Sequence, residues 1–193
     1  MLSTITVGGM RDITAGGRRV LDAAAALFYR EGINAVGVAA VAEAAGVTKK
    51  TLYDCFGSKS ELVVAYLRAR DAAWWPVLDA RLAAASRPRV LALFDAYVDP
   101  AVDTSRGCAF LNAATELPDG HPGLEVVRAH KRAVRRRLGA LVREETPDPG
   151  GVLASHLYLV LEGAVSQRRH DPSPRHHRAA RTIAAGLLLR TRR

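Results

Sequence analysis

The sequence predicts an all-α protein with a small N-terminal helix-turn-helix domain and a larger C-terminal helical bundle. Three observations predict it. Apolar residues recur at helical spacing along most of the chain, strand-like alternation is scarce, and Pro- and Gly-rich clusters separate the helical segments. Hydrophobic residues make up 49% of the 193 residues, which is enough to form a packed core.

The first helix is predicted over residues 13–30. Thr14 is a suitable N-cap, and Gly32 stands where a glycine often ends a helix. Gly16 and Gly17 conflict with this prediction, because each glycine inside a helix costs about 1 kcal/mol relative to alanine. One buried stripe is expected, formed by Val20, Leu21, Ala24, Leu27 and Phe28.

Two short helices are predicted over residues 38–45 and 48–56. Gly46 lies in the turn between them and Gly57 follows the second, at positions where glycine tolerates positive φ. Ala42 is small enough for two helices to cross at a steep angle, so the spacing is that of a helix-turn-helix. The apolar residues expected to face the shared core are Val41, Ala45, Val47, Leu52 and Phe56.

A long fourth helix is predicted to begin at Ser58, where Ser58 and Glu61 form a capping box. Pro76 is expected to bend or end this helix near Trp75. The start of this helix suggests a domain boundary, with residues 1–57 before it and residues 58–193 after it. Further helices are predicted over residues 90–98, 108–117, 122–145, 151–168 and 175–191.

The helix over residues 48–56 has two different faces. At 100° per residue, Leu52 and Phe56 face the core, whereas Lys50 and Asp54 lie on the opposite side. Lysine and threonine near a helix N-terminus suit base edges and phosphates in a major groove, and Tyr53 can donate to a phosphate. The alternative is an ordinary helical hairpin with a solvated face.

The net charge of +9 is typical of proteins that bind nucleic acid, but most of it lies outside the predicted DNA-binding element. Residues 1–60 hold 7 Lys and Arg against 5 Asp and Glu, a net of +2, which leaves +7 for the remainder. The basic runs in that remainder are interpreted as solvated helix faces.

No apolar run reaches the roughly 20 residues that span a bilayer, and the N-terminus does not resemble a secretory signal. The expected location is therefore the cytoplasm, with no membrane contact. Cys55 and Cys108 are interpreted as free, reduced thiols, with a redox switch as the alternative.

The sequence predicts no enzyme activity, no cofactor and no metal site. It contains no nucleophile–base–orienter set, no phosphate-binding glycine loop and no zinc signature. Adjacent His176 and His177 diverge by about 100° on a helix, and no cysteine or carboxylate completes a ligand set with His170.

Three stretches together resemble the N-terminal domain of TetR-type transcriptional regulators over roughly residues 14–64. They are Val20 to Phe28 with Glu31-Gly32, then Val41 to Tyr53, then Phe56 to Leu62. The later stretch from Gly107 to Leu117 is similar to a segment in the C-terminal domain of some members.

The resemblance implies an all-helical subunit of about nine helices that binds a palindromic DNA operator as a homodimer. It also implies a repressor that an unidentified small-molecule effector releases from DNA. Residues 1–57 would then be the DNA-binding domain, and residues 58–193 the effector-binding and dimerisation domain. In the matched positions, Thr48, Lys49, Lys50 and Thr51 would face the groove, while Tyr53 and Lys59 would hold phosphates. Two positions depart from the family pattern: Gly37 replaces a common Ser or Thr, and Cys55 replaces a common His.

An effector site is expected among the central helices, although aromatic residues at helical spacing also fit a plain core. The candidate residues are Trp74, Trp75, Phe94, Phe110, Asn112, Glu116, Tyr158 and Glu162, with Tyr97 as a further aromatic. Apolar stripes on the last two helices suggest a four-helix dimer interface, one through Leu153, Leu157, Val160 and Leu161 and the other through Ile183, Leu187 and Leu188. Two alternatives stay open: a DNA-binding regulator with a protein partner or no effector, and a small helical enzyme.

Overall fold

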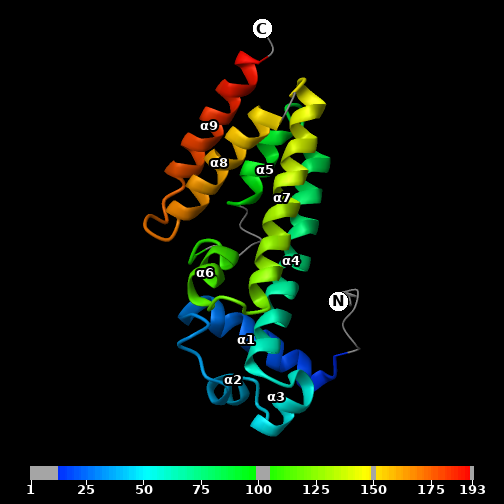
Figure 1. Ribbon diagram of the computed structural model, residues 1–193, viewed down its shortest axis with the longest axis vertical. Helices are drawn as coiled ribbons and strands as arrows, with labels where there is room; N and C mark the ends of the chain where they lie inside the picture. The colour runs from blue at the N-terminus through cyan, green and yellow to red at the C-terminus, as the bar shows by residue number, and fades with distance from the viewer. Residues whose placement is uncertain (1–12, 99–104, 149–150, 192–193) are drawn as a thin grey trace. The chain divides into compact units, whose positions relative to one another are not determined.

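The computed structural model describes residues 13–98, 105–148 and 151–191, and across these ranges it contains helices and no strand (Figure 1). This confirms the predicted all-α class. The described helices are α1 (Ala15–Glu31), α2 (Val38–Ala44), α3 (Lys49–Phe56), α4 (Lys59–Ala84), α5 (Val90–Ala96), α6 (Ala109–Glu116), α7 (Gly123–Glu145), α8 (Val152–Gln167) and α9 (Arg175–Arg190).

The helices group into two compact units. Unit 1 contains the described residues of Met1–Ala72 and Asn112–Val127, and unit 2 those of Ala73–Leu111 and Arg128–Arg193. Helices α4, α6 and α7 contribute residues to both units. The predicted domain boundary at residue 58 stays a prediction. Among the described residues, no helix is long and apolar enough to cross a membrane.

Helix α1 begins and ends where its capping residues predict. Thr14 Oγ1 accepts a hydrogen bond from Gly17 N at 3.1 Å, and Gly32 N donates to Phe28 O at 3.1 Å. Gly32 has φ of 104°, a conformation that favours glycine. The expected stripe is buried except for Leu27, which is half-buried.

The turn between α2 and α3 depends on Gly46, whose φ is +61°. Val47 N donates to Ala42 O at 3.0 Å and so closes the turn, while the Ala42 side chain lies in the helix crossing with 3% exposure. Val41 and Leu52 are fully buried beside it. The predicted helix-turn-helix is therefore present in unit 1.

Helix α4 does not end at Pro76, which was one of the two outcomes expected there. The helix runs through the proline to Ala84. Pro76 is exposed, while Trp74, Leu78 and Leu82 are buried in the core of unit 2, so packing on both sides of the proline keeps the segment helical despite its missing N–H.

The capping box before α4 is half formed. Glu61 N donates to Ser58 Oγ at 3.0 Å, as predicted, but Ser58 N donates to Phe56 O at 2.8 Å and not to the Glu61 side chain. The Ser58 hydroxyl thus supplies the cap alone.

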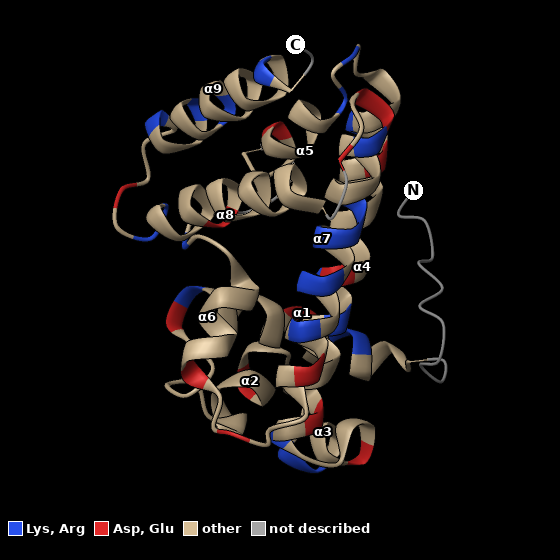
Figure 2. Ribbon diagram, turned by 45° about the horizontal axis from the view of Figure 1, so that its top comes forward, with Lys and Arg blue, Asp and Glu red and all other residues tan. Residues whose placement is uncertain are grey.

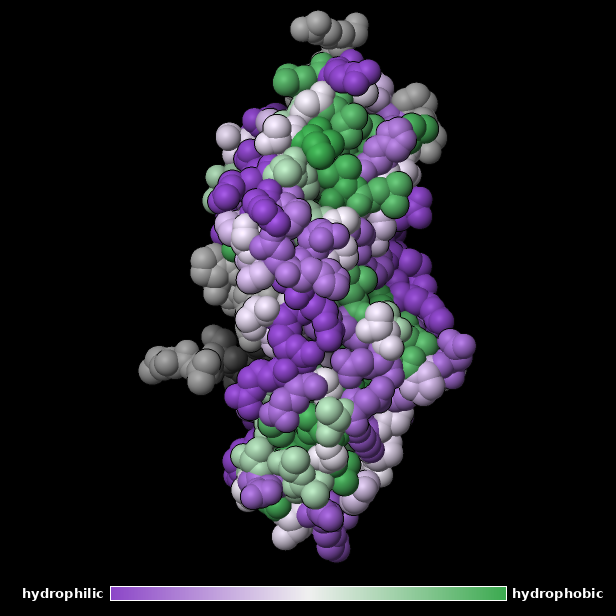
Figure 3. Space-filling model, turned by 90° about the vertical axis from the view of Figure 1, so that its left-hand side faces the viewer, coloured by the Kyte–Doolittle hydropathy of each residue, from purple (hydrophilic) through white to green (hydrophobic). Residues whose placement is uncertain are grey.

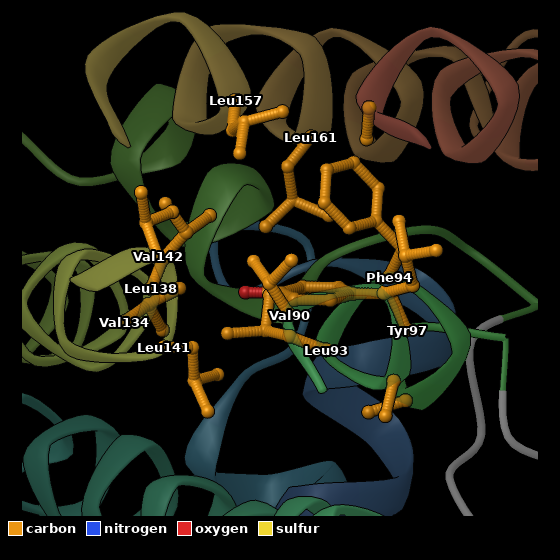
Figure 4. Close-up of a cluster of buried hydrophobic side chains, with 14 of the residues drawn as sticks. Val90, Leu93, Phe94, Tyr97, Val134, Leu138, Leu141, Val142, Leu157 and Leu161 are labelled. Carbon is orange, nitrogen blue, oxygen red and sulfur yellow. The ribbon is translucent and has the colours of Figure 1, made fainter. Parts of the chain in front are cut away.

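The core of unit 2 lies between α5, α7 and α8 (Figure 4). Phe94 and Leu93 of α5 are almost fully buried, and so are Leu138 of α7 and Leu157 and Leu161 of α8. Nearly every residue of α5 is buried, which explains why this short helix contains few polar residues.

The inward face of α8 corrects the predicted dimer stripe. Leu153, Leu157 and Leu161 are buried inside unit 2 and are unavailable for an interface between subunits. The apolar residues that remain exposed on α8 are Val152 at 58% and Leu159 at 68%. On α9 the exposed ones are Ile183 and Leu189, whereas Leu188 is buried and Leu187 is half-buried.

Candidate nucleic-acid interface

Helix α3 packs on the rest of unit 1 through its apolar side, and its polar side faces solvent. Leu52 is fully buried and Phe56 is half-buried. Lys49 and Lys50 are exposed, and Tyr53 is 45% exposed. A helix placed this way can enter a major groove with its lysines first.

The N-terminus of α3 is held by two threonines. Thr48 Oγ1 accepts from Thr51 N at 3.1 Å, and the two hydroxyl oxygens lie 3.0 Å apart. Each hydroxyl keeps hydrogen-bonding capacity for another partner. The cap therefore fixes the start of the helix without removing these groups from the candidate interface.

Lys50 and Asp54 form an ion pair on the solvent side of α3. Their Nζ and Oδ2 atoms lie 2.7 Å apart, with side chains 82% and 60% exposed. The hydrogen bond and the charge of Asp54 raise the pKa of Lys50. Water surrounds the pair, so a phosphate can compete with Asp54 for the lysine.

Lys59 has a different environment at the start of α4. Its side chain is half-buried, and partial burial lowers its pKa while the charge of Glu116 opposes the shift. Both residues belong to unit 1. Lys59 therefore lies near an acid at the helix start where the sequence predicts a phosphate contact.

The two departures from the family pattern also have defined surroundings. Gly37 is the N-cap of α2 with no side-chain hydrogen bond, and a Cβ there would meet nothing within 4 Å. Cys55 is exposed, with its Sγ 3.7 Å from Thr14 Oγ1. Neither supplies the side-chain oxygen or imidazole that the pattern places there.

The glycine pair that conflicts with the first helix lies beside α3. A Cβ on Gly17 would lie 3.4 Å from Cys55 Sγ, and one on Gly16 would lie 3.6 Å from Thr51 Cγ2, which are ordinary van der Waals distances. The close contact is local, because a Cβ on Gly17 would meet Ile13 Cγ2 at 2.7 Å. The contacts with α3 therefore do not require glycine at either position.

Sequence reasoning missed the long-range hydrogen bonds that support the helix-turn-helix. Arg19 Nε donates to Ala45 O at 3.1 Å and so fixes the end of α2 to α1. Asn34 N donates to Glu116 Oε2 at 3.1 Å, and Asn34 Nδ2 donates to Glu116 O at 2.6 Å. The last residue of α6 is thereby joined to the loop between α1 and α2.

The predicted effector residues separate into two groups. Asn112 and Glu116 belong to unit 1, where Glu116 is bonded to Asn34. The other six belong to unit 2, and their role in effector binding stays a prediction. They are Trp74, Trp75, Phe94, Phe110, Tyr158 and Glu162.

Basic residues lie both on α3 and along α7 (Figure 2). On α7, Arg128, Arg132, Arg135 and Arg136 are exposed, as expected for a solvated face. Their number explains why net charge alone did not locate the helix-turn-helix.

Residues 20–66 match the family model described as bacterial regulatory proteins, tetR family. This match covers α2 and α3, most of α1 and the start of α4. No curated protein matches the sequence significantly.

The fold is similar to that of solved regulators over nearly the whole chain. A TetR-family transcriptional regulator from Streptomyces coelicolor is 29% identical with a TM-score of 0.81, and the match covers 91% of this chain and 89% of that one. A TetR transcriptional regulator from Chloroflexus aurantiacus is 27% identical with a TM-score of 0.76, and the match covers 93% and 97%.

Proposed function

Because the chain belongs to the TetR family of helix-turn-helix transcriptional regulators, we propose that it is a cytoplasmic homodimer that represses transcription from a palindromic operator. A small-molecule effector bound in unit 2 releases it from the DNA. The observation that supports DNA reading most directly is the orientation of α3, whose Leu52 is fully buried while Lys49, Lys50 and Tyr53 face solvent.

The proposed contacts divide by chemistry. Thr48, Lys49, Lys50 and Thr51 meet base edges and nearby phosphates in the major groove. Tyr53 and Lys59 bind phosphates, which position the helix without reading sequence. Lys50 exchanges its partner Asp54 for DNA on binding.

The dimer is proposed to form through the outward faces of α8 and α9, which lie on the face seen in Figure 3 with its hydrophobic patches. Val152 and Leu159 are exposed on α8, and Ile183 is exposed on α9. Gly163 and Gly186 are exposed on the same two helices, and a Cβ at either would meet nothing within 4 Å, so a partner helix can approach closely. A two-fold axis through this face would pair two copies of the chain, and we propose that the dimer binds two half-sites one DNA turn apart.

Effector control requires that binding in unit 2 alters the placement of α3. Helices α4, α6 and α7 run through both units, and the end of α6 is bonded to the loop before α2 through Glu116 and Asn34. A ligand that prefers one arrangement of these helices would change the spacing of the two α3 helices.

The test is selection of bound duplexes from a random pool, followed by binding measurements with the selected duplex over a range of salt concentrations. The double variant Lys50→Ala, Tyr53→Ala is expected to bind the selected duplex about 100-fold more weakly and with a smaller salt slope. Arg136→Ala, which removes one exposed charge from α7, serves as the control and is expected to change affinity less than threefold.

Two results would count against the proposal. If the double variant binds every duplex as well as the unchanged protein does, α3 is not the reading helix. If light scattering of the free protein at micromolar concentration gives the mass of one chain, the proposal that the chain forms a homodimer is wrong.

A further inference from the structure

The hydroxyl of Tyr97 is a buried donor without a partner. Tyr97 follows α5 and is 7% exposed, and its Oη makes no hydrogen bond within the described ranges of the chain. Figure 4 shows the ring within the core cluster of unit 2, with its oxygen on the side of Val134 and Leu138. Burial raises the pKa of Tyr97 well above its usual value, so the group remains a neutral hydroxyl that can donate. Such groups are uncommon in folded proteins and point to a missing partner.

The polar groups near Tyr97 have no net charge, because Lys131 and Glu162 form an ion pair and Tyr158 is neutral. Lys131 Nζ lies 2.7 and 2.9 Å from the carboxylate oxygens of Glu162, and the two side chains are only 15% and 19% exposed. Burial, followed by the charge of Glu162, raises the pKa of Tyr158 to about 12, so this hydroxyl is neutral as well. Arg135 also acts on Tyr158, but it is exposed and screened by water.

Aromatic rings surround the same place. The Trp74 ring lies 5.3 Å from that of Tyr97 and 5.4 Å from that of His130, with Trp75 at 4.9 Å. His130 stacks on Phe110 with ring centres 3.7 Å apart. Both tryptophans of the chain are therefore in this cluster. Flat rings of this kind favour a flat ligand.

We propose that Tyr97, the Lys131–Glu162 pair and the rings of Trp74 and Phe110 form the binding site for an uncharged, planar ligand that offers a hydrogen-bond acceptor, such as an aromatic carbonyl compound. Tyr97 donates to that acceptor. The proposal rests on the effector part of the proposed function and specifies the class of ligand.

Each part of the ligand class follows from one feature of the site. The acceptor follows from the unpartnered donor. The absence of charge follows from the Lys131–Glu162 pair, because an ionic ligand would have to separate two ions already in contact. The planar shape follows from the rings.

The test uses the two tryptophan indole N–H signals in the NMR spectrum of the full chain, because both tryptophans lie in the cluster. Three probes share one ring: acetophenone is neutral with an acceptor, isopropylbenzene lacks the acceptor, and benzoate is an anion. Acetophenone is expected to shift the indole signals saturably and to bind about fivefold more tightly than either other probe. Equal binding of acetophenone and isopropylbenzene, or no indole shift with any probe, would overturn the proposal.

Tyr97→Phe separates the proposed role from plain packing. Without ligand, the variant is expected to melt about 2–4 °C higher, because it loses a buried hydroxyl with no partner. With probes, it is expected to lose the preference for acetophenone over isopropylbenzene. Tyr66→Phe, which removes a hydroxyl from a buried tyrosine of unit 1, is the control and should keep that preference. A Tyr97→Phe variant that keeps the full preference would contradict the assignment.

The failure of this site and the failure of the proposed function give different results. If acetophenone shifts the indole signals but leaves operator binding unchanged, the site stands and the effector mechanism fails. If the chain binds no operator at all, the indole titration still judges the site on its own.

Discussion

Each unit contains an ion pair with a 2.7 Å separation, but the two pairs have opposite environments. Lys50 and Asp54 in unit 1 are 82% and 60% exposed, whereas Lys131 and Glu162 in unit 2 are 15% and 19% exposed. Water competes for the first pair, so it contributes little to folding and can open for a new partner. The second pair can lose a member only by leaving a poorly solvated charge behind. The same ion-pair distance therefore serves two roles. Lys50 and Asp54 can separate and bind new partners, whereas Lys131 and Glu162 stay paired inside unit 2.

Two histidines also differ between the units, in whether their ring nitrogens have hydrogen-bond partners. In unit 1, His121 Nδ1 accepts from Gly123 N at 3.0 Å, so its Nε2 carries the proton and donates to Ser60 Oγ at 2.9 Å. In unit 2, His177 is 4% exposed, and neither ring nitrogen has a partner within the described ranges. Unit 1 satisfies its histidine, whereas unit 2 buries one without compensation.

The largest predicted effect comes from breaking the buried pair. Lys131→Met is expected to lower the free energy of unfolding by about 3 kcal/mol, because the mostly buried Glu162 would lose its ion-pair partner. The measurement is urea unfolding at one protein concentration, monitored by circular dichroism. The double variant Lys131→Met, Glu162→Leu is expected to recover most of the loss. A single variant as stable as the unchanged protein would show that the pair is solvated like that of Lys50 and Asp54.

The parts of the fold that sequence could predict are those set by neighbouring residues. The helix ends at Thr14, Thr48 and Gly57 depend on caps and glycines within one turn, and the structure confirms them. The exposed side of α3 also followed from helical spacing alone, since Leu52 supplies a single strong apolar anchor. The assignment of that face to DNA contact remains a prediction.

The parts that sequence could not predict depend on distant partners. Helix α4 continues past Pro76 because packing on both sides supports it. Helix α8 is apolar on more than one face, so periodicity could not decide between burying Leu157 and burying Leu159. The bond between Asn34 and Glu116 joins residues 82 positions apart, and no local pattern indicates it. The unpartnered Tyr97 hydroxyl, similarly, is visible only once the core is assembled.

The second prediction concerns pH and tests the histidine contrast. Burial, with smaller effects from Arg168 and His176, lowers the pKa of His177 to about 4 from its usual 6.5. The unfolded chain therefore binds a proton more readily than the folded chain between these two values. Stability from this residue is present above pH 6.5 and is lost as the pH falls towards 4, on the order of 2 kcal/mol.

The measurement is thermal unfolding from pH 7 to pH 4. His177→Leu is expected to unfold with a flatter pH dependence, and it should be at least as stable as the unchanged protein at pH 7, because it removes two unpartnered ring nitrogens. His121→Leu is the control: it removes a histidine that has two partners and should be destabilising at neutral pH. An unaltered pH profile in His177→Leu would assign the acid sensitivity to other groups.

The smallest predicted effect comes from releasing the exposed pair. Asp54→Asn keeps the size of the side chain but removes the charge that holds Lys50. We expect the melting temperature to change by only about 1 °C, because exposed pairs contribute little to folding. Binding to the selected operator is expected to tighten about threefold, and the salt slope should steepen by about 0.9 for one additional phosphate contact.

Glu43→Gln is the matched control for Asp54→Asn, because it removes another exposed acid of the helix-turn-helix that lies outside α3. Long-range repulsion of DNA by the acid would make the two variants alike, with tighter binding in both. Release of Lys50 would steepen the salt slope in Asp54→Asn alone. If Asp54→Asn instead weakens binding to the selected duplex and spares others, Asp54 itself accepts a hydrogen bond from a base such as cytosine. Lys50 and Asp54 would then each contact DNA. Asp54 would read sequence as well as hold Lys50 in place.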